Sequence, residues 1–176
     1  MSSGTLGVIS SRAILSSPSA GSYAPCGSCR TTSRCRSTAF FAVFGIQNWK
    51  ILSVIWALIP ILNGVFLDVA VDIRRGSPTF GRHVSVELSG DNKRQFFVPR
   101  GFAHGFSVLS DEAVFQYKCD NLYAPESEGA IAWDDPTLGI DWRLAPGDVV
   151  LSPKDSGHPR LEEAAELFDY NTDYYA

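Results

Sequence analysis

The thiols and imidazoles of this chain are few, and their spacing decides which chemistry they could support. Four cysteines and three histidines occur in 176 residues. Cys26 and Cys29 have the C-x-x-C spacing of a zinc-binding or redox pair, but no second pair and no nearby histidine completes a tetrahedral site. We therefore expect no metal at this pair, and the cysteines do not require an oxidising compartment.

The signature motifs of several common catalytic classes are missing. No glycine-rich phosphate loop follows a predicted strand, and no Gly-x-Ser-x-Gly string marks a hydrolase nucleophile. From Asp68 onward there are ten basic and nineteen acidic residues, a net charge of −9. Because an acidic domain repels phosphate backbones, a nucleic acid is not expected as a partner.

The period of the apolar residues predicts the elements that position any functional side chain. Residues 66–73 alternate four aliphatic side chains with Asp68, Ala70 and Asp72, which predicts a half-buried strand. Further strands are predicted over residues 83–88, 94–98, 104–109, 113–118 and 148–151, and a short helix over residues 161–167. Val84, Val86 and Leu88 are expected to face inward. Short strands at this spacing favour an all-β fold, an antiparallel sandwich or barrel.

The first sixty-odd residues differ in composition from the rest. Residues 1–38 are rich in Ser, Gly, Thr and Arg without a period, so disorder is expected, whereas residues 39–67 are strongly apolar. Three interpretations stay open: a membrane anchor of marginal length, a targeting segment, and a segment foreign to the domain through a misplaced start or a frame error. We favour the last, and we divide the chain into residues 1–63 and a domain over residues 64–176.

Short strings follow one another in a fixed order within that domain. They are Asp68-Val-Ala-Val-Asp-Ile-Arg-Arg75, Ser77-Pro-Thr-Phe-Gly81, Val98-Pro-Arg-Gly-Phe-Ala-His-Gly-Phe106, Phe115-Gln-Tyr-Lys118, Trp133-Asp-Asp-Pro136 and Leu151-Ser-Pro-Lys-Asp155. Each string alone is weak evidence, but the ordered set is specific. Over residues 64–172 the chain resembles the dTDP-4-dehydrorhamnose 3,5-epimerase family.

The resemblance implies a cupin jelly roll, incomplete here at its N-terminal side. It also implies a cytoplasmic homodimer that uses no metal or other cofactor and no membrane. The family converts dTDP-4-dehydro-6-deoxy-D-glucose, a dTDP-4-keto-6-deoxy sugar, to dTDP-4-dehydro-L-rhamnose by inverting C3 and C5. The reaction needs a base beside the C4 ketone, a group that stabilises the enolate, and an acid that returns a proton on the other face.

The resemblance also implies roles for individual residues. Tyr117 matches the catalytic acid, and a phenol is protonated at neutral pH and can donate. Asp155 matches the aspartate that orients the base histidine. Four residues match substrate contacts: His104 near the nucleotide phosphates, Tyr123 stacked on the thymine ring, and Glu128 and Lys154 at nucleotide-binding positions.

A metal-dependent cupin is a competing interpretation of His104. In such cupins, a string similar to Pro-x-Gly-x-x-His supplies one metal ligand, and here His104 ends such a string. The other two histidines, His83 and His158, do not have ligand spacing. We therefore expect no metal site in the domain.

One part of the family pattern is missing. The family's base histidine lies in an Arg-Gly-Leu-His segment upstream of the strand that begins here at Phe66, whereas residues 1–63 contain no histidine. Loss of a general base costs about 10²–10⁴-fold in rate, so little or no activity is expected from this chain. The alternative function is a non-catalytic sugar-nucleotide-binding cupin.

Overall fold

Strand β4 (Val65–Asp72) lies at the centre of a three-stranded antiparallel sheet. It pairs with β6 (His83–Ser89) on one side and with β7 (Phe102–Val108) on the other. The computed structural model describes residues 30–36, 46–47, 55–56, 64–119, 128–151, 155–165 and 167–175, and of these it describes residues 30–36, 46–47, 55–56, 115–119, 128 and 146 by their backbone alone.

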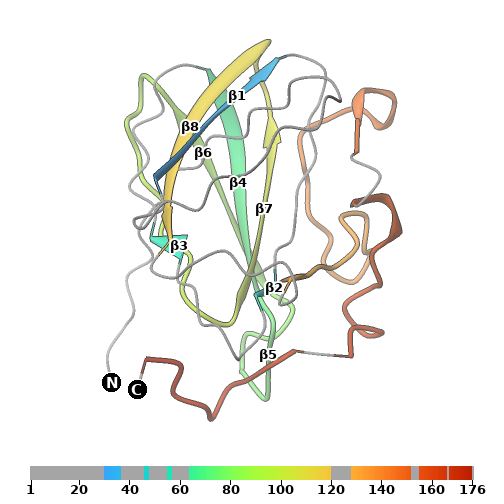
Figure 1. Cartoon of the computed structure of the whole chain (residues 1–176). Helices are drawn as coiled ribbons and strands as arrows, with labels where there is room; N and C mark the ends of the chain where they lie inside the picture. The colour runs from blue at the N-terminus through green and yellow to red at the C-terminus, as the bar shows by residue number, and fades with distance from the viewer. Residues whose placement is uncertain are drawn as a thin grey trace.

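A second antiparallel sheet lies across the first, so that the strands form two layers (Figure 1). Its central strand β8 (Glu112–Cys119) pairs with β1 (Arg30–Arg36) and with β3 (Ile55–Trp56). Two short pairings join β2 (Ile46–Gln47) to β9 (Glu128–Gly129) and, in parallel, β5 (Arg74–Arg75) to β10 (Phe168–Asp169). The 3-10 turns η2 (Pro146–Asp148) and η3 (Asp155–Gly157) follow β9 in the chain.

Both faces of β4 are buried, so the prediction of a half-buried strand is wrong. One face packs its four aliphatic side chains under the C-terminal part of the chain, including Ile131, Leu138, Trp142, Leu161, Phe168 and Tyr174. The other face, called the inner face below, packs Phe66 and Ala70 between the sheets with Leu88, Phe96, Val98, Val108 and Ala113. Asp68 and Asp72 share the inner face and are each 1% exposed. Two carboxylates therefore lie within a core, where each needs partners.

Four predicted strands, over residues 66–73, 83–88, 104–109 and 113–118, are confirmed as β4, β6, β7 and β8 within one or two residues at each end. Two others are wrong, because residues 94–98 and 148–151 each contain only a single bridge residue, Val98 and Val150. On β6, Leu88 is buried as expected, but Val84 is 42% exposed. Among the described strands of its sheet, β6 has a neighbour on one side only. Its apolar side chains are therefore less buried than their alternation in the sequence predicts.

The predicted helix over residues 161–167 is also wrong. Residues 161–165 form one turn, in which the N–H groups of Glu163 and Ala164 donate to the carbonyl of Arg160. The Arg75 guanidinium donates to the Ala164 carbonyl at 3.1 Å. So short a segment forms too few helical hydrogen bonds to offset the cost of nucleation, and its turn is held by tertiary contacts instead.

Part of the segment expected to be disordered is a strand. Residues 30–36 form β1 and pair over their whole length with β8. The composition of this segment has no strand period, so its order depends on the partner that β8 supplies, whose hydrogen bonds offset the entropy of ordering. The expectation of disorder is therefore wrong for these seven residues.

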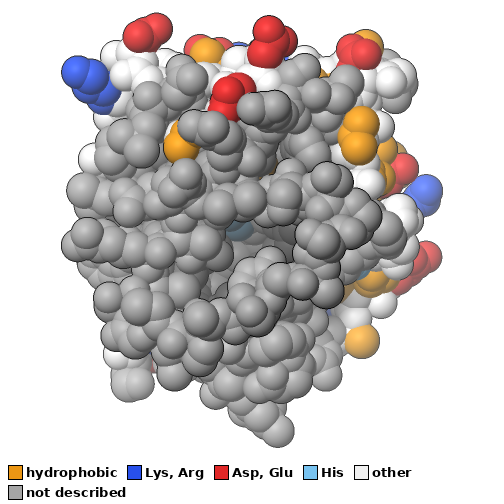
Figure 2. Space-filling view, turned by 45° about the horizontal axis from the view of Figure 1, so that its top comes forward, with side chains coloured by type: hydrophobic (Ala, Val, Ile, Leu, Met, Phe, Trp, Pro, Cys, Tyr) orange, Lys and Arg blue, Asp and Glu red, His pale blue; other side chains and the backbone are white. Residues whose placement is uncertain are grey.

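None of the helical segments among the described residues has the length and apolarity that a bilayer crossing requires. The apolar run that raised a membrane anchor, residues 51–67, lies mostly outside the described residues. Acidic side chains lie along the margin of the described surface in Figure 2, in keeping with the excess of Asp and Glu after residue 67.

Candidate active site

The inner face carries an imidazole–carboxylate pair, His104 and Asp68. The two residues come from neighbouring strands, and His104 Nε2 is hydrogen-bonded to Asp68 Oδ1. The side chain of His104 is 12% exposed and that of Asp68 is 2% exposed. The Phe106 ring lies beside the imidazole, with ring centroids 6.4 Å apart. A buried carboxylate on one paired strand therefore fixes the orientation of a partly accessible ring on the next.

Burial raises the pKa of the Asp68 carboxyl, and the adjacent His104 imidazole offsets part of that rise. A carboxylate behind an imidazole fixes which ring nitrogen bears the proton and stabilises the imidazolium form. The pair can therefore exchange a proton with a bound molecule or present a cationic ring to an anionic group. Among the described residues, no group of three or more His, Cys, Asp or Glu side chains could hold a metal ion.

Asp72, on the same face at the end of β4, has a different set of contacts. Its Oδ1 accepts from the backbone N–H and the Nε of Arg74 at 3.0 and 2.9 Å. Its Oδ2 accepts from the Arg74 guanidinium at 2.8 Å and from the hydroxyls of Ser77 and Thr79 at 2.6 Å each. Burial alone would raise the pKa of Asp72, but these donors outweigh it and lower the pKa to about 2. Asp72 is thus an ionised anchor for the turn that follows β4.

Asp155 forms the second imidazole–carboxylate contact of the described chain. It begins η3 and is 5% exposed, and its Oδ1 lies 3.5 Å from Nε2 of His158, three residues later. The distance is too long for a good hydrogen bond. The predicted role of Asp155 was to orient the family's upstream histidine, and the imidazole that the structure places beside it is His158.

Asp135 fixes the segment that carries His158. Its Oδ2 accepts from the N–H of Leu161 at 2.7 Å, and its Oδ1 accepts from the N–H and the hydroxyl of Thr137. Burial alone would raise the pKa of Asp135, but these bonds lower it. The turn after His158 is therefore tied to the segment that follows β9.

Of the six predicted site residues, the structure describes the side chains of two, His104 in β7 and Asp155 in η3. His104 contacts Asp68, and Asp155 contacts His158. Tyr117 lies in β8 opposite Thr31, and Glu128 lies in β9 opposite Gln47, but their side chains are outside the described part. Tyr123 and Lys154 also lie outside the described residues. The roles of all six remain predictions.

Two residues of these pairs were missed in the sequence. Asp68 was assigned to the solvent face of a half-buried strand, although its neighbours on that face, Phe66 and Ala70, are apolar. An acid alternating with apolar residues in a strand that is apolar on its other face is the signal that could have marked it. His158 had no comparable signal, because its contact depends on the turn at η3.

The fold defines the class of the protein: an all-β cupin, as predicted. A family model described as dTDP-4-dehydrorhamnose 3,5-epimerase matches residues 54–163. The chain therefore belongs to the dTDP-4-dehydrorhamnose 3,5-epimerase family.

Individual relatives agree with this assignment. The chain is 49% identical over 107 residues to the dTDP-4-dehydrorhamnose 3,5-epimerase of Methanothermobacter thermautotrophicus, with 60% of this chain and 58% of that protein covered. It is 51% identical over 110 residues to that of Escherichia coli, with 62% and 59% covered. A crystal structure of dTDP-6-deoxy-D-glucose-3,5-epimerase from Legionella pneumophila, in complex with dTDP-4-keto-L-rhamnose, is 45% identical, with a TM-score of 0.74 and 82% and 75% covered. The chain thus spans less than two thirds of the length of the two relatives named first.

Proposed function

We propose that this chain binds a dTDP-4-keto-6-deoxy sugar between its two sheets and promotes proton exchange beside the ketone, as a member of the rhamnose-precursor epimerases. The observation that carries the proposal is the Asp68–His104 pair, a partly accessible imidazole oriented by a buried carboxylate within the part that matches the family. The Legionella relative was crystallised with a dTDP-4-keto sugar, which supports this substrate class.

The proposed chemistry needs one proton removed and one returned at each inverted carbon. When a C–H bond beside the C4 ketone breaks, its electron pair passes to the ketone oxygen as an enolate, and a proton added from the opposite face inverts the centre. His104 is the proposed contact to the substrate, with Asp68 holding its ring. Tyr117 is the proposed donor, because it lies in β8, the central strand of the second sheet, at the position where the family resemblance implies the catalytic acid.

Slow turnover is part of the proposal. Residues 1–63 contain no histidine that could serve as the family's base. We therefore expect exchange about 10²–10⁴-fold slower than in relatives that carry this histidine, the usual cost of a missing general base. The cytoplasmic location, the homodimer and the nucleotide contacts of Tyr123, Glu128 and Lys154 remain predictions alongside it.

The test has a binding step and an exchange step. Titration calorimetry with thymidine diphosphate measures binding, and mass spectrometry after incubation of dTDP-4-dehydro-6-deoxy-D-glucose in D₂O measures deuterium at C3 and C5. His104→Gln is expected to weaken binding and exchange, and Tyr117→Phe to reduce exchange alone. His83→Gln is the matched control, because His83 is another histidine of the central sheet but lies at the start of β6, whereas His104 lies in β7. The absence of thymidine diphosphate binding in the folded wild type would overturn the proposal.

The second candidate is a non-catalytic sugar-nucleotide-binding cupin, and the missing upstream histidine favours it. It predicts thymidine diphosphate binding with no deuterium uptake above a protein-free control. Slow uptake that Tyr117→Phe abolishes would instead exclude it.

A further inference from the structure

The last part of the described chain, residues 168–175, runs along the end of the central sheet, and we call it the C-terminal strap. Its first residues form β10, which pairs in parallel with β5, so that Phe168 lies opposite Arg74. The N–H of Tyr170 extends this pairing by donating to the Arg75 carbonyl at 3.0 Å. The strap is therefore attached directly after β4, the strand that carries Asp68.

The strap is held in shape by its own aromatic residues. The Phe168 and Tyr174 rings meet edge to face with centroids 5.1 Å apart, and both residues belong to the core beneath the sheet. The Tyr174 hydroxyl accepts from the N–H of Asp169 at 2.6 Å. A carboxylate oxygen of Asp173 accepts from the N–H of Tyr175 at 2.8 Å. These contacts fix the backbone that carries Tyr175.

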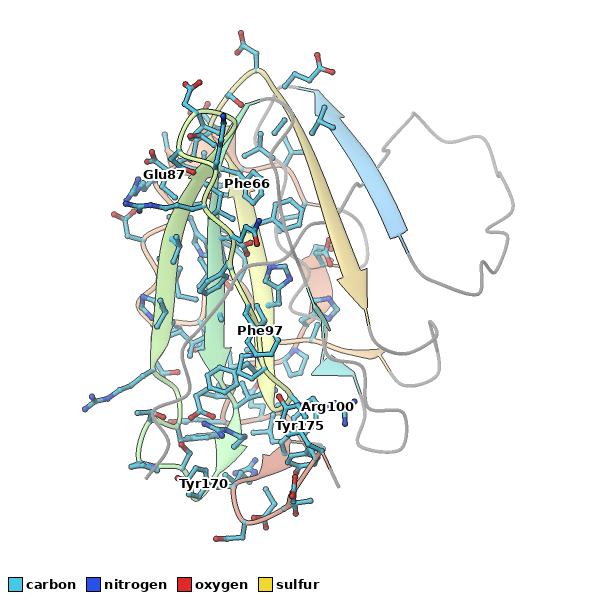
Figure 3. The ribbon with its side chains drawn as sticks, turned by 90° about the vertical axis from the view of Figure 1, so that its left-hand side faces the viewer. Phe66, Glu87, Phe97, Arg100, Tyr170 and Tyr175 are labelled. Atoms are coloured by element: carbon cyan, nitrogen blue, oxygen red, sulfur yellow. The ribbon has the colours of Figure 1, made fainter. Side chains whose placement is uncertain are left out.

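Tyr175 reaches from the strap to the turn that precedes β7. Its hydroxyl accepts from the backbone N–H of Arg100 at 3.1 Å, and its ring lies 5.0 Å from the Arg100 guanidinium carbon. The same guanidinium donates to the carbonyl of Tyr174. Figure 3 shows Arg100 and Tyr175 together at one end of the sheets, with Tyr170 further along the same end. The strap thus contacts both the backbone and the side chain of Arg100.

A second arginine, Arg74, lies against the same turn. The Arg74 guanidinium, fixed by Asp72, contacts the rings of Phe102 and Tyr170, with its central carbon 4.6 and 5.1 Å from their centroids. Gly101 has φ +83°, and a Cβ there would lie 2.6 Å from Cγ and Cδ of Arg74. Because Gly101 has no side chain, the arginine can pass against the turn backbone.

We infer that the C-terminal strap positions His104, with Tyr175 and Arg100 as its positioning residues. β7 begins at Phe102, and His104 is its third residue. The turn held by the strap therefore sets where β7 starts against β4, and through that pairing it sets where the imidazole lies relative to Asp68. Tyr175 is 58% exposed. Its contacts at that exposure add little to overall stability, so their main effect is on the geometry of the turn. The effect on ligand affinity rests on the proposed function, whereas the effect on His104 does not.

The test compares Tyr175→Ala and Tyr175→Phe with the wild-type chain, and Phe80→Ala serves as a control that removes an exposed ring elsewhere. Heteronuclear NMR records the imidazole resonances of His104, and calorimetry records the affinity for thymidine diphosphate. We expect Tyr175→Ala to move the His104 resonances and to weaken thymidine diphosphate binding about threefold to tenfold. Tyr175→Phe keeps the ring and should give a smaller change of the same sign, and Phe80→Ala should give none.

The outcomes separate the two proposals. If the wild type does not bind thymidine diphosphate, the proposed function fails, and the His104 resonances still decide the role of the strap. His104 resonances in Tyr175→Ala that coincide with those of the wild type would overturn the inference, whatever the affinity. Circular dichroism of Tyr175→Ala, expected to match the wild type, establishes that a resonance shift reports local geometry. A loss of fold in that variant would also contradict the inference, because it assigns Tyr175 little weight in overall stability.

Discussion

Asp68 and Asp72 occupy the same face of the same strand, four residues apart, and are equally buried, yet their contacts differ. Asp72 accepts from a guanidinium, a backbone N–H and two hydroxyls, whereas the side-chain partner of Asp68 is the His104 imidazole. Burial would raise the pKa of either carboxyl. At Asp72 the donors outweigh burial and the pKa is about 2, while at Asp68 burial prevails and the pKa is raised.

The difference shows how burial can serve either stability or chemistry. A carboxylate with every lone pair engaged is ionised at any ordinary pH and ties a turn to a strand. A carboxylate with a titratable partner can share a proton with it, which is useful where a ring must gain and lose charge. Asp72, at the end of β4, therefore stabilises the fold, whereas Asp68, in the middle of the strand, supports the proposed site. Mutation of Asp72 should mainly lower stability, and mutation of Asp68 should mainly weaken ligand binding.

The largest expected effect is on stability at the end of β4. Asp72→Ala leaves the half-buried Arg74 guanidinium and two hydroxyls without their acceptor, and we expect the free energy of unfolding to fall by about 3–5 kcal/mol. Urea denaturation measures it. Asp91→Ala, at an exposed position, is the control and should change stability by less than about 0.5 kcal/mol. A loss at Asp72 no larger than at Asp91 would show that the network is incidental.

The close approach of Arg74 to Gly101 should give the next largest effect. Gly101→Ala must bear a positive φ and a Cβ 2.6 Å from the arginine side chain, so we expect a loss of about 2–4 kcal/mol in unfolding free energy. Gly139→Ala is a matched control, since its φ is +58° but nothing lies within 4 Å of its Cβ. It should lose only the backbone part, about 1 kcal/mol. Equal losses at both positions would mean that Arg74 moves aside freely.

The pH dependence of stability separates the two carboxyls more finely. The pKa of Asp72 is lowered from 3.8 to about 2, so the unfolded chain binds the proton more tightly. The corresponding stability, about 2 kcal/mol, is fully present above pH 4 and is lost as pH falls through about 2. Acid titrations of the unfolding free energy should show this slope in the wild type and not in Asp72→Asn. The same slope in the wild type and in Asp72→Asn would show that other acidic residues cause the pH dependence.

The strands of the central sheet could be predicted because their alternation is intrinsic to the residues. Strand β1 could not, since residues 30–36 have no period and depend on pairing with β8. The predicted strand over residues 94–98 failed for the converse reason. Asn92 accepts from the N–H groups of Ser89 and Arg94, and Lys93 adopts φ 50°, so the chain turns where alternation alone suggests a strand.

The site could be predicted only in part, because a motif names a residue but not its partner. The string ending at His104 marked that histidine, and the register of β4 against β7 then decided that its ring meets Asp68. Alternation places Asp68 on a face but cannot say whether that face is covered. Asp155 and His158 lie three residues apart, but only the turn at η3 brings their side chains together.

Asp68→Asn is expected to change stability less than Asp72→Ala or Gly101→Ala does, and it tests the comparison most directly. The amide can still accept a hydrogen bond from His104 and carries no charge to desolvate, so the unfolding free energy should stay within about 1 kcal/mol of wild type at pH 7. The raised pKa of Asp68 means that the native chain holds this proton more tightly than the unfolded one. Wild-type stability should therefore fall as pH rises from 3.8 through that raised pKa, a slope that Asp68→Asn lacks.

Ligand binding, unlike stability, should change clearly in Asp68→Asn. Without the carboxylate the His104 ring loses the partner that fixes its orientation, and thymidine diphosphate affinity should drop about tenfold. If Asp68→Asn instead unfolds the chain as Asp72→Ala does, both carboxylates are structural anchors and the middle of β4 carries no separate site.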